Sequence, residues 1–439
     1  MEAMRAMMHG TLTVTGMLLA SLGGVGCGPS APPPSPAPLP GPEPTRPVER
    51  PFPIERLDRP VRPGLEVVLS DSAHLIRGLR VGLLSNQSGI DRQGRSGVDL
   101  LLQAGVRLTA LFSPEHGFRG AAAPGEAVAS SVDPATGLPI YSLYGRTSSP
   151  TPQMLEGVDV MLIDLQDVGA RYYTWLATAV EVMKAAAEQD KRVILLDRPN
   201  PIGGAVQGNV LDPAHASTVG RLAIPMRHGM TLGELALLAR QDLSLTTDFR
   251  VIPADGWRRD LDFGATGLPF VPPSPNLRDL EALYHYPGLC LFEATALSVG
   301  RGSDAPFRQI GAPWLDTTAV LAVLRRAMPP GVRFESVIFT PRNPGDGKHP
   351  DTRLRGIRLV LTDPAAYDPA FTALLLLEAV RAVHPDGIGI DPPRFDRLAG
   401  GPALRHALTE GKGPVGIEAG WREDRRVFLE RRRAVLLYP

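Results

Sequence analysis

The sequence has only two cysteines in 439 residues, Cys27 and Cys290. At most one disulfide can form, so the fold cannot rest on a disulfide framework. The chain also has no surplus of either charge, because 46 Lys and Arg residues balance 46 Asp and Glu residues. No basic stripe that could neutralise phosphates stands out either, and we therefore expect no nucleic acid as a partner.

Several signatures of other chemistries are missing. No two histidines have the His-x-x-x-His spacing of a zinc site and the cysteines do not cluster, so we expect no metal. No Gly-x-Ser-x-Gly segment is present, which counts against a serine esterase. The Gly-Arg-Gly segment at 300–302 follows no strand of a βαβ unit and does not indicate a dinucleotide. The sequence therefore predicts no cofactor.

Residues 1–27 have the composition of an export signal. Arg5 supplies a positive charge, residues 11–22 form a short apolar run, and Gly-Val-Gly-Cys follows at 24–27. The run is too short for a membrane span, and small residues directly before a cysteine suit lipoprotein processing. We expect Cys27 to be lipidated, with plain secretion and cleavage near Gly26 as the alternative. The protein would then be exported to the cell envelope, on its periplasmic or extracellular face, with the lipid as its only membrane anchor.

Residues 28–63 predict a tether between that anchor and the folded body. Nine prolines fall between positions 29 and 44, and proline supplies no backbone donor for a helix or a sheet. Such a segment favours extended polyproline II and can span roughly 100 Å at ~3.1 Å per residue. The spacer would let an anchored domain reach the cell wall.

From residue 64 to about 263, short apolar runs alternate with helical segments. The runs occupy residues 80–87, 108–116, 158–167 and 192–200, and the clearest helical spacing covers residues 174–189. Apolar runs without strict alternation are typical of strands buried on both faces. Alternation of such strands with helices predicts an α/β fold with a doubly wound parallel sheet. Thr231 and Glu234 form a capping box that begins a further helix.

Residues 264–439 predict a second, smaller α+β domain. A loop-rich region at 266–311 precedes helix candidates at 317–326, 369–383 and about 421–433. One strand is expected at 356–361, and a Pro- and Gly-rich stretch at 340–349 predicts an exposed loop.

Polar residues gather at the carboxyl ends of the predicted strands, where ligands bind in doubly wound sheets. They are Asn86, Glu115, His116, Asp164, Asp167, Arg171, Asp197, Arg198 and Asn200. Glu115 lies in Ser-Pro-Glu-His-Gly at 113–117, where Pro114 and Gly117 turn the chain. A carboxyl group held at a strand end in a cleft can donate a proton to a leaving oxygen. Pairing with Arg119, or capping of a helix, is the structural alternative.

The other candidates also have structural alternatives. Asp164 and Asp167 could be acid or base groups, metal ligands, or members of a local ion pair, and Arg171 is close enough in sequence to neutralise Asp167. Asp197 and Asn200 could bind sugar hydroxyls, but both residue types are common in turns. Two further pairs complete the candidates: Arg227 with His228, and Glu293 with Arg301 in a Gly-flanked loop.

Taken together, these segments resemble the exo-β-N-acetylmuramidase family. The resemblance is carried by residues 83–89, 113–117, 138–145, 164–173, 196–203, 225–231, 273–276 and 292–314. It implies a Rossmann-like domain followed by a smaller one, with a cleft between them. It also implies release of N-acetylmuramic acid from the non-reducing end of peptidoglycan fragments, with Glu115 as the catalytic carboxyl group.

The resemblance leaves the second catalytic group open. Asp164, Asp167 or Glu293 could serve as base or nucleophile, or the 2-acetamido oxygen of the substrate could attack. Muramic acid also carries a lactyl carboxylate, which a guanidinium can bind in bidentate fashion. Candidates for that contact are Arg171, Arg198, Arg227 and Arg301. The rival function is a tethered cell-wall-binding lipoprotein that uses the same cleft without catalysis.

Overall fold

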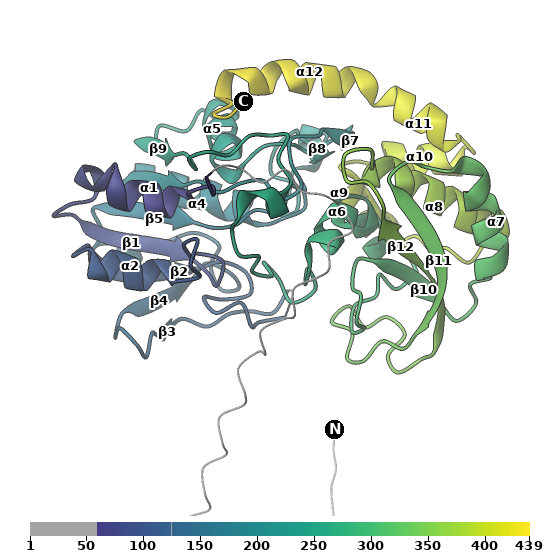
Figure 1. Ribbon diagram of the computed structural model, residues 1–439, viewed down its shortest axis with the longest axis horizontal. Helices are drawn as coiled ribbons and strands as arrows, with labels where there is room; N and C mark the ends of the chain where they lie inside the picture. Colours follow the sequence, from purple (N-terminus) through teal and green to yellow (C-terminus); the bar gives the residue numbers. More distant parts are fainter. Residues whose placement is uncertain (1–58, 124) are drawn as a thin grey trace, which may run out of the picture. The chain divides into compact units, whose positions relative to one another are not determined.

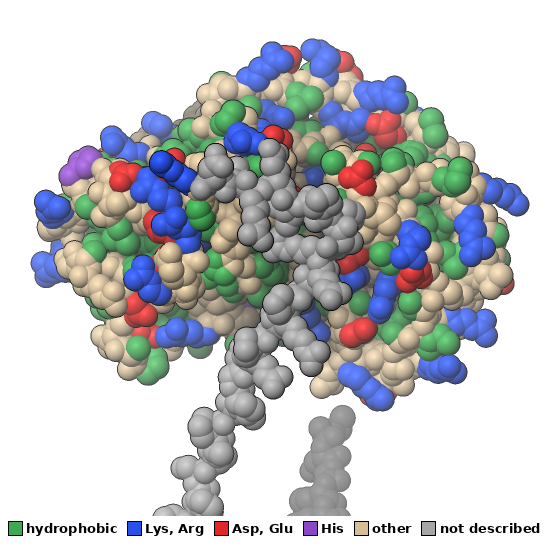
Figure 2. Space-filling model, viewed as in Figure 1, with side chains coloured by type: hydrophobic (Ala, Val, Ile, Leu, Met, Phe, Trp, Pro, Cys, Tyr) green, Lys and Arg blue, Asp and Glu red, His purple; other side chains and the backbone are tan. Residues whose placement is uncertain are grey.

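The computed structural model describes residues 59–123 and 125–439. The predicted export signal, Cys27 and nearly all of the predicted tether lie outside these residues. In the described part of the chain, no helix is both long and apolar enough to cross a membrane. On the face shown in Figure 2, basic and acidic side chains are interspersed.

A seven-stranded sheet forms the first part of the body (Figure 1). Its spatial order is β3 (Ser131–Val132), β4 (Pro139–Ser142), β2 (Arg107–Ser113), β1 (Arg80–Ser85), β5 (Val160–Asp164), β6 (Arg192–Leu196) and β9 (Phe249–Ile252). All neighbouring strands are parallel except β3 and β4. This arrangement confirms the predicted doubly wound fold.

Helices cover both faces of this sheet, because successive strand residues point to opposite sides. Val160 and Leu162 of β5 join a core with α1 (Gly64–Ser70) and α2 (Gly97–Gln103). Met161 and Ile163 of the same strand join the other core, with α4 (Trp175–Glu188) and α5 (Leu232–Asp242). The short α3 (Pro152–Leu155) precedes β5. The predicted capping box at the start of α5 is present, with both reciprocal hydrogen bonds.

The second part contains a three-stranded antiparallel sheet, ordered β10 (Gln309–Ala312), β12 (Leu354–Leu361) and β11 (Val332–Phe339). Helix α7 (Thr317–Ala327) packs against β11 and β12, and α8 (Pro369–Val383) packs against α7 and against α6 (Leu280–Leu289). The predicted helices and strand of this part agree with α7, α8 and β12 to within two residues. The sequence does not reveal β11, because its side chains are mostly half-buried or exposed and no apolar run marks it.

The remaining elements are short and surround these two parts. They are the hairpin of β7 (Gln207–Val210) and β8 (Pro225–Arg227), the 3-10 turn η4 (Cys290–Ala294), α9 (Pro392–Ala399), α10 (Ala403–Thr409) and α11 (Pro414–Gly420), followed by α12 (Arg422–Arg432). Further 3-10 turns are η1 (Ala73–Leu75), η2 (Pro213–His215), η3 (Phe263–Thr266) and η5 (Arg433–Val435).

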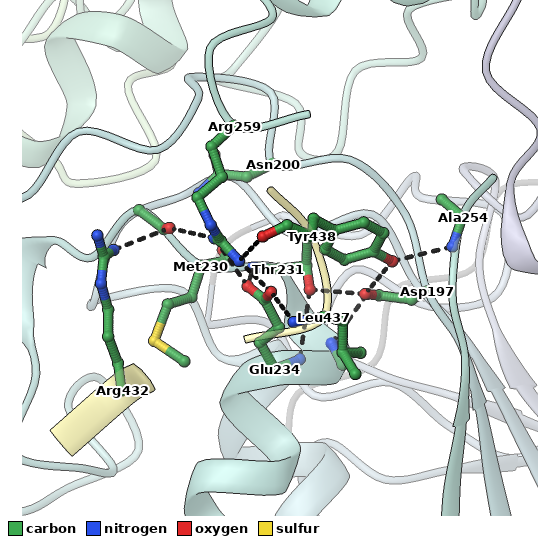
Figure 3. Close-up of polar contacts among 12 residues, drawn as sticks. Asp197, Asn200, Met230, Thr231, Glu234, Ala254, Arg259, Arg432, Leu437 and Tyr438 are labelled. Carbon is green, nitrogen blue, oxygen red and sulfur yellow. Dashed lines mark hydrogen bonds and ion pairs between the residues drawn. The ribbon is translucent and has the colours of Figure 1, made fainter. Parts of the chain in front are cut away.

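After α12 the chain ends against the first part of the body (Figure 3). The Leu437 backbone N–H donates to Glu234 Oε1 at 2.8 Å, and the Tyr438 hydroxyl donates to Asp197 Oδ2 at 2.7 Å. The Pro439 carbonyl oxygen accepts from the Arg259 backbone N–H at 3.0 Å. The C-terminal residues are therefore a structural part of the N-terminal fold.

Candidate active site

A cavity of about 490 Å³ opens where loops after β2, β4 and β5 meet α6, η4 and α9. Four of the residues proposed from sequence line it: Glu115, His116, Glu293 and Arg301. The lining also includes Tyr144, Tyr173, Thr174, Tyr286, Phe307, Asp346, Arg394 and Arg397. Carboxyl groups, guanidinium groups and aromatic rings thus share one cavity, as in sites that bind a polar ligand with apolar faces.

Glu115 is held in this cavity by two hydrogen-bond donors. Its Oε1 accepts from the Gly125 backbone N–H at 3.0 Å, and its Oε2 accepts from the Thr174 hydroxyl at 2.9 Å. His116 has a φ of 70° and turns the chain directly after Glu115. The suggested pairing with Arg119 is wrong, because Arg119 binds Asp133 at 2.7 Å instead.

Two tyrosines extend the polar surface around Glu115. Burial, the charge of Glu115 and a hydrogen bond to it raise the pKa of Tyr144 to about 12, so its hydroxyl stays protonated and can donate. Tyr173 is 8% exposed, and its hydroxyl has no hydrogen-bond partner among the described residues. Burial raises the pKa of Tyr173 as well. A buried hydroxyl left unpaired in a cavity is available to a ligand.

His116 lines the cavity as a neutral ring. Burial lowers its pKa, and its Nδ1 is 2.9 Å from the Ala122 carbonyl oxygen, to which it can donate. The ring also stands edge-on to Trp175, with centroids 6.3 Å apart. His116 therefore supports the turn that carries Glu115.

Glu293 and Arg301 form an ion pair inside the cavity, in which Arg301 Nε donates to Glu293 Oε1 at 2.7 Å. Burial is the largest single influence and lowers the pKa of Arg301, but the charge of Glu293 and the hydrogen bond to it, with smaller contributions from Tyr286 and Asp346, together raise that pKa. The guanidinium also lies 5.1 Å from the centroid of the Phe307 ring. Positive φ angles at Gly300 and Gly302 form the turn that returns Arg301 to Glu293.

Asp346 is a third cavity carboxylate, which sequence analysis missed. Its Oδ1 accepts from the Lys348 backbone N–H at 3.2 Å, whereas its buried Oδ2 has no partner among the described residues. The Lys348 ammonium group donates to the Phe292 and Leu297 carbonyls, and burial lowers its pKa to about 8. An acidic residue in a Pro- and Gly-rich loop looks solvent-exposed in sequence, and no local pattern distinguishes it.

Nine of the residues proposed from sequence do not line the cavity: Asn86, Asp164, Asp167, Arg171, Asp197, Arg198, Asn200, Arg227 and His228. Asp164 and Arg198 form a buried bidentate ion pair with distances of 2.6 and 2.9 Å. The side-chain oxygen Oδ1 of Asn86 accepts from the backbone N–H and the hydroxyl of Ser88. These side chains hold strand ends together.

The expected neutralisation of Asp167 by Arg171 is wrong. Asp167 Oδ2 accepts from the Gly169 backbone N–H at 2.8 Å and lies 3.4 Å from His228 Nε2. The buried Arg171 guanidinium instead donates to the carbonyl oxygens of Asn209, Ile224 and Leu398. A fully buried guanidinium has five donors to satisfy, and three carbonyl oxygens satisfy more of them than one carboxylate at a turn.

Asp197, Asn200 and Arg227 likewise bind the protein itself. Asp197 accepts from the Thr231 hydroxyl at 2.6 Å as well as from Tyr438 (Figure 3). The Asn200 amide donates to the Met230 carbonyl at 2.9 Å, and the Arg227 guanidinium donates to Gln207 Oε1 at 2.9 Å. Among residues 59–123 and 125–439, no group of three or more His, Cys, Asp or Glu side chains could hold a metal ion.

Comparisons with known proteins agree on one family. The models for the N-terminal and C-terminal parts of exo-β-N-acetylmuramidase NamZ match residues 81–281 and 284–438. The peptidoglycan β-N-acetylmuramidase NamZ of Bacillus subtilis (strain 168) is 39% identical over 381 residues, which cover 86% of this chain and 91% of that protein. Two DUF1343 family structures from Bacteroides fragilis NCTC 9343 are each 32% identical. They have TM-scores of 0.80 and 0.69 and cover 86% and 87% of this chain, and 99% of each of those chains is covered.

Proposed function

This chain belongs to the exo-β-N-acetylmuramidase NamZ family, and we propose that it releases N-acetylmuramic acid from the non-reducing end of peptidoglycan fragments. The enzyme is a glycosidase by family. The observation that carries the proposal is the placement of Glu115, which two donors hold in a cavity of about 490 Å³. No observation favours a non-catalytic wall-binding role.

In the proposed reaction, Glu115 is the general acid. Its carboxyl proton passes to the glycosidic oxygen while the bond between that oxygen and the anomeric carbon breaks, and positive charge develops on the sugar ring. Water then adds its hydroxyl group to the anomeric carbon, and the proton that it releases restores the carboxyl group of Glu115, directly or through the group that holds the second role. Gly125 and Thr174 fix the carboxyl orientation, and the Tyr144 hydroxyl contacts the same group. Such positioning keeps the proton in line with the leaving oxygen.

Two cavity carboxylates are candidates for the second role, Glu293 and Asp346. Asp164 and Asp167 are not, because both are bound within the protein away from the cavity. Arg301 balances the charge of Glu293, whereas Asp346 Oδ2 is unpartnered among the described residues and can accept from the substrate. Glu293→Gln and Asp346→Asn, compared on the same substrate, separate these roles: the variant with the larger fall in kcat identifies the group.

The proposed function is tested with an oligosaccharide of alternating N-acetylmuramic acid and N-acetylglucosamine, labelled at its reducing end. We expect the wild type to release free N-acetylmuramic acid and to shorten the labelled product by one sugar. Glu115→Gln should slow this by about 10²- to 10⁴-fold, the usual contribution of a general acid. Glu156→Gln makes the same chemical change at an exposed position outside the cavity and should match the wild type. Release of internal fragments, or of no sugar by a folded wild type, would contradict the proposal.

We also propose that the protein is exported and anchored by a lipid on Cys27. The support is the sequence of residues 1–63, with its basic start, apolar run, Gly-Val-Gly-Cys segment and proline-rich spacer. Labelling of the full chain with radioactive palmitate, beside Cys27→Ser, tests it. Label in the wild type alone is expected, and equal label in both, or in neither, would contradict lipidation at this position.

A further inference from the structure

The cavity contains two guanidinium groups that the protein itself does not use. Arg394 and Arg397 lie three residues apart on α9 and both line the cavity. Neither side chain has a hydrogen-bond or ion-pair partner among the described residues, although 28 salt bridges occur there. The third arginine of the lining, Arg301, is paired with Glu293, whereas Arg394 is half-buried and Arg397 is exposed without a partner there. Unpaired guanidiniums in a cavity are available to an anionic ligand.

The acidic residues of α9 do not neutralise these two arginines. Asp396 is bound by Arg405 in a bidentate pair at 2.7 and 2.8 Å. Asp391 caps the helix, since its side chain accepts from the Arg394 backbone N–H at 3.3 Å. Residues three apart lie on one face of a helix, so both guanidiniums are carried by the same side of α9, whereas Phe395 is buried in the core. The cavity-facing side of α9 is therefore cationic.

α9 is fixed at both ends, so the backbone that carries its arginines is in place before a ligand binds. The Asp391 backbone N–H donates to the Ala294 carbonyl at 2.9 Å, which ties the start of α9 to the turn that carries Glu293. The Leu398 carbonyl accepts from the buried Arg171 guanidinium at 3.0 Å, which ties its end to the loop after β5. A ligand then orders the two side chains but not the helix that carries them, which lowers the entropy lost on binding.

The charged side chains that line the cavity leave room for one negative charge on a ligand. Three carboxyl groups (Glu115, Glu293 and Asp346) share the cavity with three guanidiniums (Arg301, Arg394 and Arg397). When Glu115 carries the proton that it donates, the cavity has one surplus positive charge. His116 adds none, because burial lowers its pKa.

We propose that Arg394 and Arg397 form the carboxylate-binding site of this cavity and select muramic acid, through its lactyl carboxylate, over sugars that lack it. The inference rests on the proposed function, which places that sugar in the cavity, and it replaces the arginines expected from sequence. Arg171, Arg198 and Arg227 lie outside the cavity, and Arg301 is committed to Glu293. The role is in binding and specificity, since neither arginine is assigned to proton transfer.

The test compares an aryl β-N-acetylmuramide with its lactyl methyl ester, which keeps the shape of the sugar and removes the charge. We expect the wild type to prefer the free acid. The Arg394→Gln/Arg397→Gln double variant should lose about 10- to 100-fold in kcat/KM on the acid, the scale for hydrogen bonds to a charged group. Its loss on the ester should be at least tenfold smaller. Lysine at both positions should restore part of the preference.

Arg326→Gln, an exposed arginine on α7 outside the cavity, is the matched control and should leave both rates unchanged. Equal losses on acid and ester in the double variant would overturn the inference while leaving the proposed function intact. Should the wild type cleave neither substrate, the proposed function fails, and calorimetric binding of free N-acetylmuramic acid and its methyl ester decides the inference. If the wild type binds the acid more tightly than the ester and the double variant does not, the inference is supported. If the wild type binds both equally, the inference is overturned.

Discussion

The buried carboxyl group of Asp197 should make the stability of this protein depend on pH. Burial raises the pKa of Asp197 from 3.8 to about 6, and the charge of Glu234 acts in the same direction. Hydrogen bonds from Thr231, Tyr438 and Gly233 oppose this shift without cancelling it. The group lies where the C-terminal residues meet the first sheet (Figure 3).

The sign and size of the effect follow from linkage. Below about pH 4 the carboxyl group is protonated in both the folded and the unfolded chain, and its contribution to stability is fully present. Between about pH 4 and 6 the folded chain keeps a proton that the unfolded chain releases, so the free energy of unfolding falls as pH rises. A shift of about two pKa units corresponds to about 3 kcal/mol, lost by about pH 7.

Asp197→Asn isolates this contribution, because an amide resembles the protonated acid and cannot ionise. We expect the free energy of unfolding of the variant, minus that of the wild type, to rise by about 3 kcal/mol between pH 4 and 7. Urea denaturation at several pH values measures the difference, in which the other titrating groups cancel. Tyr438→Phe removes a hydrogen bond that lowers the pKa of Asp197, so that pKa should rise further in this variant. The free energy of unfolding should then keep falling to a higher pH than in the wild type. A difference between Asp197→Asn and wild type that is independent of pH would refute the reasoning.

Three further substitutions test the site and its support. Tyr173→Phe removes a hydroxyl with no partner among the described residues, so kcat/KM should fall about tenfold with little change in stability; a loss of stability alone would mean a structural role. Thr174→Val withdraws a donor from Glu115, and steady-state kinetics should show about a tenfold loss in kcat/KM, whereas unchanged kinetics would mean that the bond does not position the acid. Asp164→Asn leaves Arg198 buried without its carboxylate, so urea denaturation should show a loss of about 3–5 kcal/mol; a loss under 1 kcal/mol would contradict a buried ion pair.

The fold could be predicted from sequence where buried elements have a recognisable pattern of apolar residues. Strands buried on both faces are apolar throughout, which is why β1, β5 and β6 were visible, whereas the half-exposed β11 was not. Helices α7 and α8 agree with the helix candidates of the sequence, and in the structure Asp316 and Asp368 cap them.

The site was harder to predict, because strand ends place residues without showing which way their side chains point. Glu115 lines the cavity, whereas Asp164 at the end of β5 turns to Arg198 inside the protein. Whether a carboxylate meets a guanidinium of the fold or a ligand depends on long-range packing. Arg394 and Arg397 reach the cavity only because α9 packs on η4, a contact that no local pattern reveals.

The role of Glu115 as general acid is tested most directly by the dependence of rate on the leaving group. A leaving group that departs as a stable anion needs no proton, so the loss of a general acid should affect it little. For Glu115→Gln, kcat/KM should fall about 10²- to 10⁴-fold on the N-acetylmuramic acid–N-acetylglucosamine disaccharide, and far less on a dinitrophenyl β-N-acetylmuramide. Equal losses on both substrates would contradict the account, since they would place the role of Glu115 elsewhere than in protonation of the leaving oxygen.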